Sequence, residues 1–392
     1  MPARIEKKSK NSYLLTVNIG YDAHGKQIFR RKTVKATSER EARKAYDIFA
    51  AEVRQGRVAS TGKCKLVDFA RNWFQNYCMK ELAPKTQRSY QNHLERRILP
   101  SLGHIDIKNL MPQHIMKFLD DLRKDGTRFD KRAGQISEES IRYCFRVLSS
   151  MMQDAVQWQV IANNPCERVK PPLSNHTKVK IMDEISLQKM FSALETEPFK
   201  YQAIVMLAID SGLRLGELVA LTWTDIDMER GILHITKSNQ AMRGKGIFTK
   251  TPKNETSVRD IALSKHSIRM LQKHREMQQQ QRDQLKDKWT NGGWVFTQWN
   301  GLPVYPTTPS AWFRKFLKRH HLPHMPFHAL RHLSATVLIA RGVPLKNVSS
   351  RLGHADIRTT ANIYSEALQS VDRQAADKMD EFLGKSLQTE SE

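Results

Sequence analysis

The chain has 392 residues, which is enough for about two or three domains. Its 64 Lys and Arg residues outnumber its 40 Asp and Glu residues, so the formal net charge is +24 and the pI is near 9.9. This excess favours a polyanionic partner, nucleic acid before membrane. No apolar run approaches the roughly 20 residues of a membrane-spanning helix. No apolar segment follows the charges at the N-terminus, so we expect a cytoplasmic protein without a signal peptide.

The four cysteines are widely separated and form no C-x-x-C pair. They are Cys64, Cys78, Cys144 and Cys166. Such a distribution is typical of reduced thiols in the core of a cytosolic protein. We therefore expect neither a disulfide framework nor a structural zinc site.

Residues 1–62 are expected to form a small β-sheet followed by a helix. Residues 13–19 alternate apolar and polar side chains, and residues 28–34 indicate a second strand after an Asp/Gly turn. Ser38 with Glu41 three positions later is a capping-box pattern at the start of an amphipathic helix. Four basic residues in the second strand or directly after it could contact a DNA groove: Arg30, Arg31, Lys32 and Lys35. The alternative is a solvated, charged strand pair.

Residues 63–172 are expected to be all helical. Apolar residues recur at helical spacing through this segment, and Thr86 is the expected N-cap of its second helix, which Pro100 and Gly103 should end. The basic residues Lys85 and Arg88 flank Thr86, and we interpret all three as candidate DNA contacts. The alternative for them is an ordinary soluble surface.

Residues 173–392 are expected to be mostly helical with a small antiparallel sheet. Asp183 is a predicted helix cap, residues 201–209 predict a buried helix, and Gly212 should end that helix. Arg214 and Glu217 then stand three apart at a new helix start. Three short segments with strand character follow, at residues 231–239, 246–251 and 258–264. The whole chain is therefore predicted to be a mainly α, multidomain protein.

Several residue types that are suited to catalysis lie close together between residues 327 and 364. His328 and Arg331 lie three apart in an apolar, helix-like run, so both should project from one helix face. Gly353 and His354 follow a second short apolar segment, and Tyr364 comes ten residues after His354. Arg can neutralise phosphate oxygens, His can move protons, and Tyr can form a covalent phosphoryl intermediate.

This spacing resembles the C-terminal signature of the tyrosine recombinases, the phage-integrase family. The preceding segments also resemble the family's arm-site domain (residues 1–62) and its helical core-binding domain (residues 63–172), with a catalytic domain at residues 173–392. This build is similar to the phage and conjugative-transposon branch. The resemblance implies six site residues: Arg214, Lys253, His328, Arg331, His354 and Tyr364. Glu217 would orient Arg214.

Two positions depart from the family pattern, and one role stays open. Ala329 replaces the common Asp after the first His, and Asn254 replaces the usual Thr after Lys253. Lys250 and Lys245 are close enough to compete with Lys253 for the role of the hairpin lysine.

The resemblance further implies a reaction without cofactor or metal. Tyr364 would attack the phosphate, in cis or in trans, and form a 3′-phosphotyrosine, while Lys253 would protonate the departing 5′-oxygen. The implied partners are double-stranded DNA at core and arm sites, a tetrameric synapse joined by a C-terminal helix at residues 371–383, and host bending and directionality factors. No membrane partner is expected, and the location would be the bacterial nucleoid.

Three rival interpretations remain open. His324, His328 and His332 suggest a metal site, but Pro323 and Pro326 interrupt the helix pattern and no H-E-x-x-H motif is present. A topoisomerase-IB-like enzyme would use the same nucleophile to relax DNA. A non-catalytic DNA-binding protein on a recombinase scaffold would have lost the chemistry, although all six site positions hold competent residues.

Overall fold

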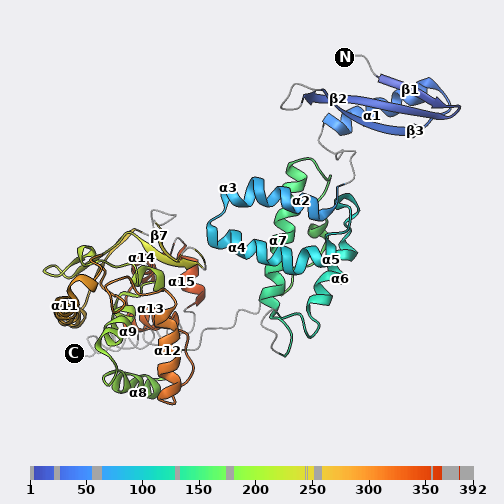
Figure 1. Cartoon of the computed structure of the whole chain (residues 1–392). Helices are drawn as coiled ribbons and strands as arrows, with labels where there is room; N and C mark the ends of the chain where they lie inside the picture. The colour runs from blue at the N-terminus through green and yellow to red at the C-terminus, as the bar shows by residue number, and fades with distance from the viewer. Residues whose placement is uncertain are drawn as a thin grey trace, which may run out of the picture. The chain divides into compact units, whose positions relative to one another are not determined.

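The computed structural model describes residues 4–21, 27–54, 64–128, 133–173, 181–242, 244, 246–250, 258–354, 356–363 and 379. The chain divides into two compact units, Met1–His176 and Thr177–Glu392. Figure 1 shows strands and one helix at the start of the first unit, a helical bundle in its remainder, and helices with short strands in the second unit.

The N-terminal part contains an antiparallel sheet in the order β1-β2-β3 with one helix against it (Figure 1). Its elements are β1 (Arg4–Ser9), β2 (Ser12–Tyr21), β3 (Gln27–Lys35) and α1 (Glu39–Arg54). Tyr13, Leu15 and Val17 alternate along β2 and are buried with Phe49 of α1. The predicted cap is present, because Ser38 Oγ accepts the N–H of Glu41 at 3.3 Å. The Glu41 carboxylate accepts the N–H of Thr37 at 2.8 Å.

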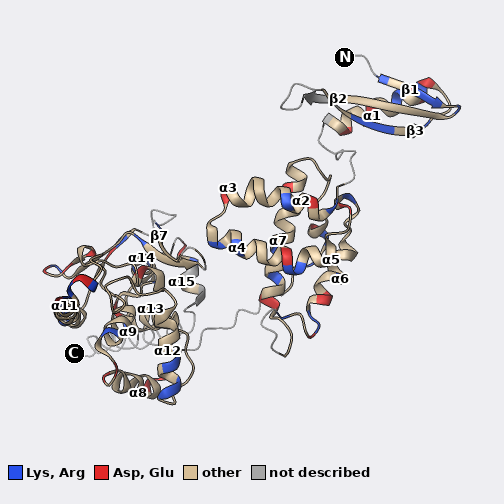
Figure 2. Cartoon of the chain, in the orientation of Figure 1, with Lys and Arg blue, Asp and Glu red and all other residues tan. Residues whose placement is uncertain are grey.

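The strand register divides the four basic residues of β3 between the two faces of the sheet. Arg30 pairs with Val17 and Lys32 with Leu15, so both lie on the face that α1 covers. Lys32 lies 3.6 Å from Glu52 and 5.5 Å from the centroid of the Phe49 ring. Arg31 and Lys35 alternate with these residues and therefore belong to the open face. Figure 2 shows the basic residues along β3.

The remainder of the first unit is a helical bundle around one apolar core. Its elements are α2 (Leu66–Trp73), η1 (Phe74–Cys78), α3 (Met79–Glu81), α4 (Pro84–His93), η2 (Leu94–Ile98), α5 (Leu99–Leu102), η3 (Ile107–Asn109), α6 (Pro112–Leu122), α7 (Glu138–Gln157) and η4 (Pro165–Arg168). Trp73, Phe118 and Ile141 are among its fully buried side chains. All four cysteines are free thiols, and three of them are buried.

One expectation for α4 is wrong and another holds only in part, because Gly103 but not Pro100 ends the helix. The helix begins at Pro84 with Ala83 as its N-cap, so Thr86 lies inside the first turn and caps nothing. Proline favours the first helical position because its missing N–H has no partner there in any case. The helix also passes Pro100 and ends only at Gly103, through the wide π-helical turn η2. A π turn changes the i→i−4 hydrogen-bond pattern, so a proline directly after it removes less bonding than one inside a regular helix.

The second unit combines helices with two small sheets. Its elements are α8 (Glu184–Leu194), α9 (Phe199–Ser211), α10 (Leu215–Leu218), η5 (Trp223–Asp225), β4 (Ile226–Asp227), β5 (Ile232–Ile235), β6 (Ser238–Met242), β7 (Gly246–Lys250), β8 (Arg259–Ala262), α11 (Lys265–Leu285), η7 (Lys286–Lys288), α12 (Thr308–Arg319), α13 (Ala329–Ala340), α14 (Leu345–Leu352) and α15 (Ile357–Ile363). The expected single sheet is instead two, β4-β5-β8 and the hairpin β6-β7, because β8 pairs with β5 and leaves the hairpin on its own. Asp183 caps α8 as predicted, through its bond to the N–H of Ser186.

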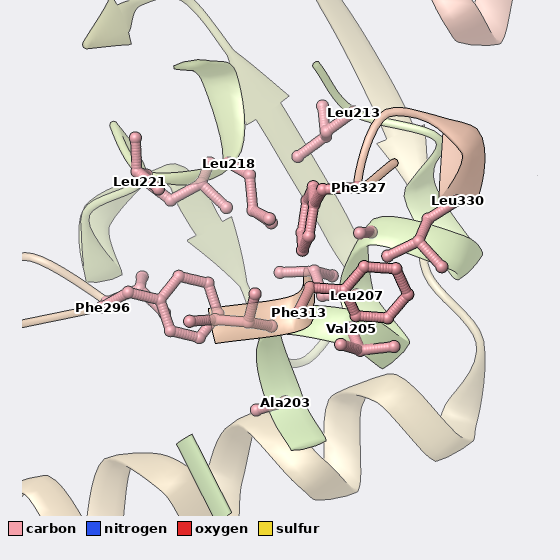
Figure 3. Packing of buried hydrophobic residues seen from close by; sticks show 14 of the residues in the cluster. Ala203, Val205, Leu207, Leu213, Leu218, Leu221, Phe296, Phe313, Phe327 and Leu330 are labelled. Carbon is pink, nitrogen blue, oxygen red and sulfur yellow. The ribbon is translucent and has the colours of Figure 1, made fainter. Parts of the chain in front are cut away.

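The core of this unit holds the ends of α9 and α13 in place. Figure 3 shows Leu207, Leu213, Phe313, Phe327 and Leu330 in one cluster. The rings of Phe313 and Phe327 meet edge to face, with centroids 5.7 Å apart. Side chains beside Leu213 and Phe327 therefore project from a rigid, close-packed base.

None of the described helices is both long and apolar enough to cross a membrane.

Candidate active site

Arg214 stands where the chain turns from α9 into α10. Gly212 ends α9 with a left-handed φ of 64°, and Leu213 and Leu218 are buried on either side of the turn. Arg214 is the N-cap of α10, and Glu217 is its third residue. The Glu217 carboxylate accepts both the backbone N–H of Arg214, at 3.1 Å, and its Nη1, at 2.9 Å. The spacing that indicated this pair in the sequence thus produces a capping interaction.

Glu217 is 6% exposed and carries a charge shared between two arginines. Nη2 of Arg259, on β8, donates to Glu217 Oε2 at 2.9 Å. Burial alone would raise the pKa of Glu217, but the hydrogen bonds and charges of Arg259 and Arg214 outweigh it and hold that pKa below its usual value. Glu217 is therefore an ionised anchor for both side chains.

The second anchor of Arg214 comes from the end of α14. Arg214 Nη2 donates to the carbonyl oxygen of Gly353 at 2.9 Å. Gly353 ends α14 with a φ of 67°, and a Cβ atom there would lie 2.9 Å from Nη1 of Arg259. Both the backbone conformation and the space require glycine at this position.

Arg331 is almost fully buried, at 2% exposure, and its Nη1 donates to the carbonyl oxygen of Gly212 at 2.8 Å. Each of the two candidate phosphate ligands is thus held by a glycine carbonyl at the end of a helix from another part of the unit. The glycine two residues before Arg214 binds Arg331, and the glycine at the end of α14 binds Arg214. Since α13 packs against α9, these two hydrogen bonds connect the segment around Arg214 with the segments that carry Arg331 and Gly353.

His328 is the exposed N-cap of α13, fixed by the buried Phe327 and Ala329 on either side. Partial burial of the ring, and then the positive charges of Arg331 and Arg214, lower the pKa of His328. The two guanidinium groups therefore lie within electrostatic range of this imidazole. Ala329, which departs from the family pattern, is completely buried.

His354 follows Gly353 and is held by the next helix. Its Nδ1 lies 2.8 Å from Oγ1 of Thr360, a fully buried residue of α15. Burial, followed by the charges of Arg331 and Arg214, lowers the pKa of His354 to about 4. The ring is therefore neutral at pH 7.

The histidines considered as metal ligands are arranged differently. The His328 and His332 rings meet edge to face, with centroids 5.1 Å apart. Burial, then the neighbouring His328 and Arg331, lower the pKa of His332 to about 4. Over the residues that the structure describes, no group of three or more His, Cys, Asp or Glu is placed to hold a metal ion.

Two of the six sequence-derived site residues, Lys253 and Tyr364, lie outside the described residues, as do Lys245 and nearly all of residues 371–383. Lys250 is described, and it ends β7 opposite Ser238. The last described helix, α15, ends at Ile363, one residue before Tyr364. The structure therefore brings together Arg214, His328, Arg331 and His354.

Arg259 and Thr360 were given no role from the sequence. Arg259 falls in the segment 258–264 that was predicted to have strand character, and a place in a strand gives no sign that its side chain reaches Glu217. Thr360 lies six residues after His354, a spacing that identifies no partner without the fold.

Two family models match the sequence. The model described as "Phage integrase family" matches residues 180–370, which contain the whole arginine–histidine arrangement. The model described as "Phage integrase, N-terminal SAM-like domain" matches residues 65–123, within the helical bundle.

Curated relatives match over nearly their whole lengths. A "Tyrosine recombinase XerC-like" protein of Caldanaerobacter subterraneus subsp. tengcongensis is 28% identical, over 96% of this chain and 97% of the relative. The ICEBs1 integrase of Bacillus subtilis is 25% identical, over 97% of this chain and 100% of the relative.

Solved structures share the fold. The Tn1549 transposon integrase in complex with transposon right end DNA aligns with a TM-score of 0.67 at 18% identity, over 80% of this chain and 100% of that one. A lambda integrase dimer bound to a COC′ core site aligns with a TM-score of 0.57 at 17% identity, over 93% and 95%. With the family models and the full-length relatives, these findings identify the chain as a member of the phage integrase family, a tyrosine recombinase that catalyses site-specific DNA recombination.

Proposed function

We propose that this recombinase integrates and excises a mobile element by cutting one DNA strand through Tyr364 and rejoining it to a new partner. The observation that carries the proposal is the holding of Arg214 and Arg331 by the Gly353 and Gly212 carbonyls. Two guanidinium groups fixed in this way are suited to stabilise negative charge on the non-bridging oxygens of a phosphate.

The histidines supply the proton chemistry. The lowered pKa of His328 keeps its ring neutral near pH 7, which suits it to accept the proton of the Tyr364 phenol. If the Thr360 hydroxyl donates to Nδ1 of His354, the proton of that neutral ring is on Nε2 and can bind the phosphate. Lys253 is assigned the protonation of the 5′-oxygen from its sequence pattern, with Lys250 as the alternative.

The three segments are assigned three roles on DNA. Residues 1–62 bind arm-type sites, residues 63–172 grip the core site, and residues 173–392 perform the reaction. On the first segment, the open face of the sheet favours Arg31 and Lys35 over Arg30 and Lys32 as phosphate contacts. On the second, Lys85, Thr86 and Arg88 share the start of α4. The Tn1549 and lambda integrases, both solved with DNA, support a DNA partner.

The active assembly is a tetramer in which residues 371–383 join neighbouring protomers. A lambda integrase tetramer bound to a Holliday junction has the same fold. An acceptor surface is available in a cavity of about 510 Å³ between α8, α9 and α11. Its apolar lining includes Phe191 and Phe199, and its basic lining includes Arg269 and Lys273. Residues 371–383 repeat apolar residues at helical spacing and contain four acidic residues, which complement this lining. Truncation after Ser370 is expected to abolish assembly and leave single-site binding.

The reaction takes place on the bacterial nucleoid in the cytoplasm, with host bending and directionality factors as accessory partners. The net charge of +24 and the basic residues on both units (Figure 2) support a nucleic-acid surface as the site of action.

A nicked suicide duplex carrying a host–element junction tests the proposal. The broken strand loses a short fragment after cleavage, so the covalent protein–DNA adduct accumulates and can be counted on a denaturing gel. The adduct should form with the wild type, disappear in Tyr364→Phe, and persist in Tyr305→Phe, which changes an exposed tyrosine of the same unit.

The same experiment separates the rival functions. Binding without any adduct at authentic junctions would favour a non-catalytic binding protein. An adduct that always reseals to its own strand, with relaxation of supercoiled DNA and no exchange, would favour a topoisomerase.

A further inference from the structure

Arg259 contacts three parts of the second unit from a buried position on β8, where its side chain is 7% exposed. Its Nε donates to the carbonyl oxygen of Arg351 at 2.7 Å, and its Nη2 donates to Glu217 at 2.9 Å. Its guanidinium also lies beside Gly353, where an added Cβ atom would be only 2.9 Å from Nη1 of Arg259. A single side chain therefore touches the first arginine motif, the end of α14 and the turn that leads to His354.

These contacts support the two groups that Arg214 binds. Arg214 binds Glu217 through Nη1 and the Gly353 carbonyl through Nη2. Arg259 holds Glu217 by a charged hydrogen bond, and its guanidinium lies beside Gly353. The direction of the Arg214 fork is thus set at two points, and Arg259 bonds to one of them and lies beside the other.

Arg259 is also the first residue of β8, the strand that follows the segment containing Lys253. Residues 251–257, which include Lys253, lie outside the described residues. β8 starts two residues later, at Arg259, and pairs with β5 from Arg259 to Ala262. An anchor at the first residue of the strand fixes the point from which the lysine segment departs.

We propose that Arg259 is a positioning residue that holds Arg214, the Gly353–His354 turn and the start of β8 in one register. The inference rests on the proposed function of this site. Because Arg259 is buried, it acts through Glu217 and the Arg351 carbonyl and does not touch the DNA.

The arrangement requires arginine in particular. A planar guanidinium presents several donors in a rigid fork, so one side chain can bond to a carboxylate and a carbonyl in different directions. Lysine would keep the positive charge and the apolar stem, but its ammonium lies at a single point. Arg259→Lys therefore tests whether several donors in a fixed geometry are needed, because it leaves the positive charge in place.

The first measurement is single-turnover cleavage of the suicide duplex by the full chain. In Arg259→Lys and Arg259→Gln we expect cleavage about 10- to 100-fold slower, the range expected when a buried charged partner is left incompletely bonded. Affinity for a single site should stay within about 2-fold. The matched control is Asp260→Asn, because the neighbouring Asp260 bonds to His234 at 2.7 Å on an exposed face.

The second readout is the dependence of cleavage on pH. Arg259 on β8 and Arg214 on α10 face Glu217 and hold its pKa low, and His328 at the start of α13 also interacts with its charge. Without Arg259, burial should raise the pKa of Glu217, so the acidic limb of the pH–rate profile should move to higher pH in Arg259→Gln. A general loss of structure would lower the rate at every pH instead.

The inference is overturned if Arg259→Lys cleaves at the wild-type rate, or if the acidic limb stays in place in Arg259→Gln. Should Arg259→Gln fail to fold, as judged by circular dichroism, Arg259→Lys decides alone. A wild type that forms no adduct counts against the proposed function. In that case a carbon-13 titration of the Glu217 carboxyl still decides whether Arg259 holds it, and an unchanged pKa in Arg259→Gln counts against the inference.

Discussion

Nη1 of Arg331 lies 2.8 Å from the carbonyl oxygen of Gly212, a residue 119 positions earlier in the chain. Because Arg331 is buried, this bond sets the position of its guanidinium against the C-terminal end of α9. The conformation of Gly212 therefore governs where Arg331, the second candidate phosphate ligand, points.

Gly212→Ala should impair both stability and cleavage. Its φ of 64° costs a non-glycine residue roughly 1–2 kcal/mol, and the new Cβ would lie 2.7 Å from a methyl carbon of Leu352. The carbonyl that binds Arg331 should shift as a result. Urea unfolding and suicide-duplex cleavage measure the two effects.

Gly342→Ala is the matched control for this prediction. Gly342 also has a positive φ, of 80°, but a Cβ there would meet nothing within 4 Å. It should lose stability without losing cleavage beyond what unfolding explains. Equal loss of cleavage in both variants would contradict the role assigned to Gly212.

Thr360→Val should slow cleavage about 5- to 10-fold, because it removes the hydroxyl that orients His354 and leaves Nδ1 without this partner. Valine has nearly the shape of threonine, so the fully buried site should still be filled. Thr360→Ser keeps the hydroxyl and should recover most of the rate. If serine and valine behave alike, the hydroxyl has no part in orienting the ring.

The second unit should lose stability as the pH falls from about 6.5 to about 4. Unfolded histidine takes up a proton near pH 6.5, whereas His332 and His354 in the folded chain have pKa values of about 4. The unfolded chain therefore binds more protons in this window, and the free energy of unfolding decreases with acidity. Above the window the contribution is fully present.

His332→Asn should reduce this pH dependence by roughly 1–3 kcal/mol between about pH 7 and about pH 4.5. Urea titrations followed by tryptophan fluorescence at the two pH values measure it. His324→Asn makes the same substitution at an exposed position outside α13 and is the control for the change of side chain. A pH dependence in His332→Asn equal to that of the wild type would show that this ring does not contribute.

Arg31→Ala and Lys35→Ala should weaken arm-site binding, whereas Lys32→Ala should mainly destabilise the N-terminal domain. The first two residues lie on the open face, while Lys32 contacts Glu52 and the Phe49 ring. Each lost phosphate contact should lower the slope of log affinity against log salt by about 1. Binding titrations at several salt concentrations measure that slope. The assignment of faces fails if Lys32→Ala changes the slope as much as Arg31→Ala does.

Local signals in the sequence predicted the parts of the site that depend on neighbours in the chain. The spacing of Arg214 and Glu217 indicated a helix start, and the structure has the capping interaction there. Ser38 and Asp183 are caps for the same reason, since a cap needs only the next turn of helix. The prediction that Thr86 is a cap was wrong because Pro84 takes the first helical position, so α4 starts two residues before Thr86.

Contacts between distant segments could not be predicted in this way. The bond from Arg259 to Glu217 spans 42 residues, and it exists because β8 pairs with β5 and α14 packs beside it. Alternation along β3 shows that Arg30 and Lys32 lie on one face of the sheet and that Arg31 and Lys35 lie on the other. It does not show which of the two faces α1 covers, and that requires the fold.

The pairing of Arg214 and Arg331 with distant glycine carbonyls limits how relatives can be recombined by engineering. In a hybrid enzyme whose crossover lies between Arg214 and Arg331, each arginine comes from one parent and the glycine carbonyl that binds it comes from the other. Crossover points that keep both arginines and both glycines from one parent should yield active hybrids more often than crossovers placed between the two arginines.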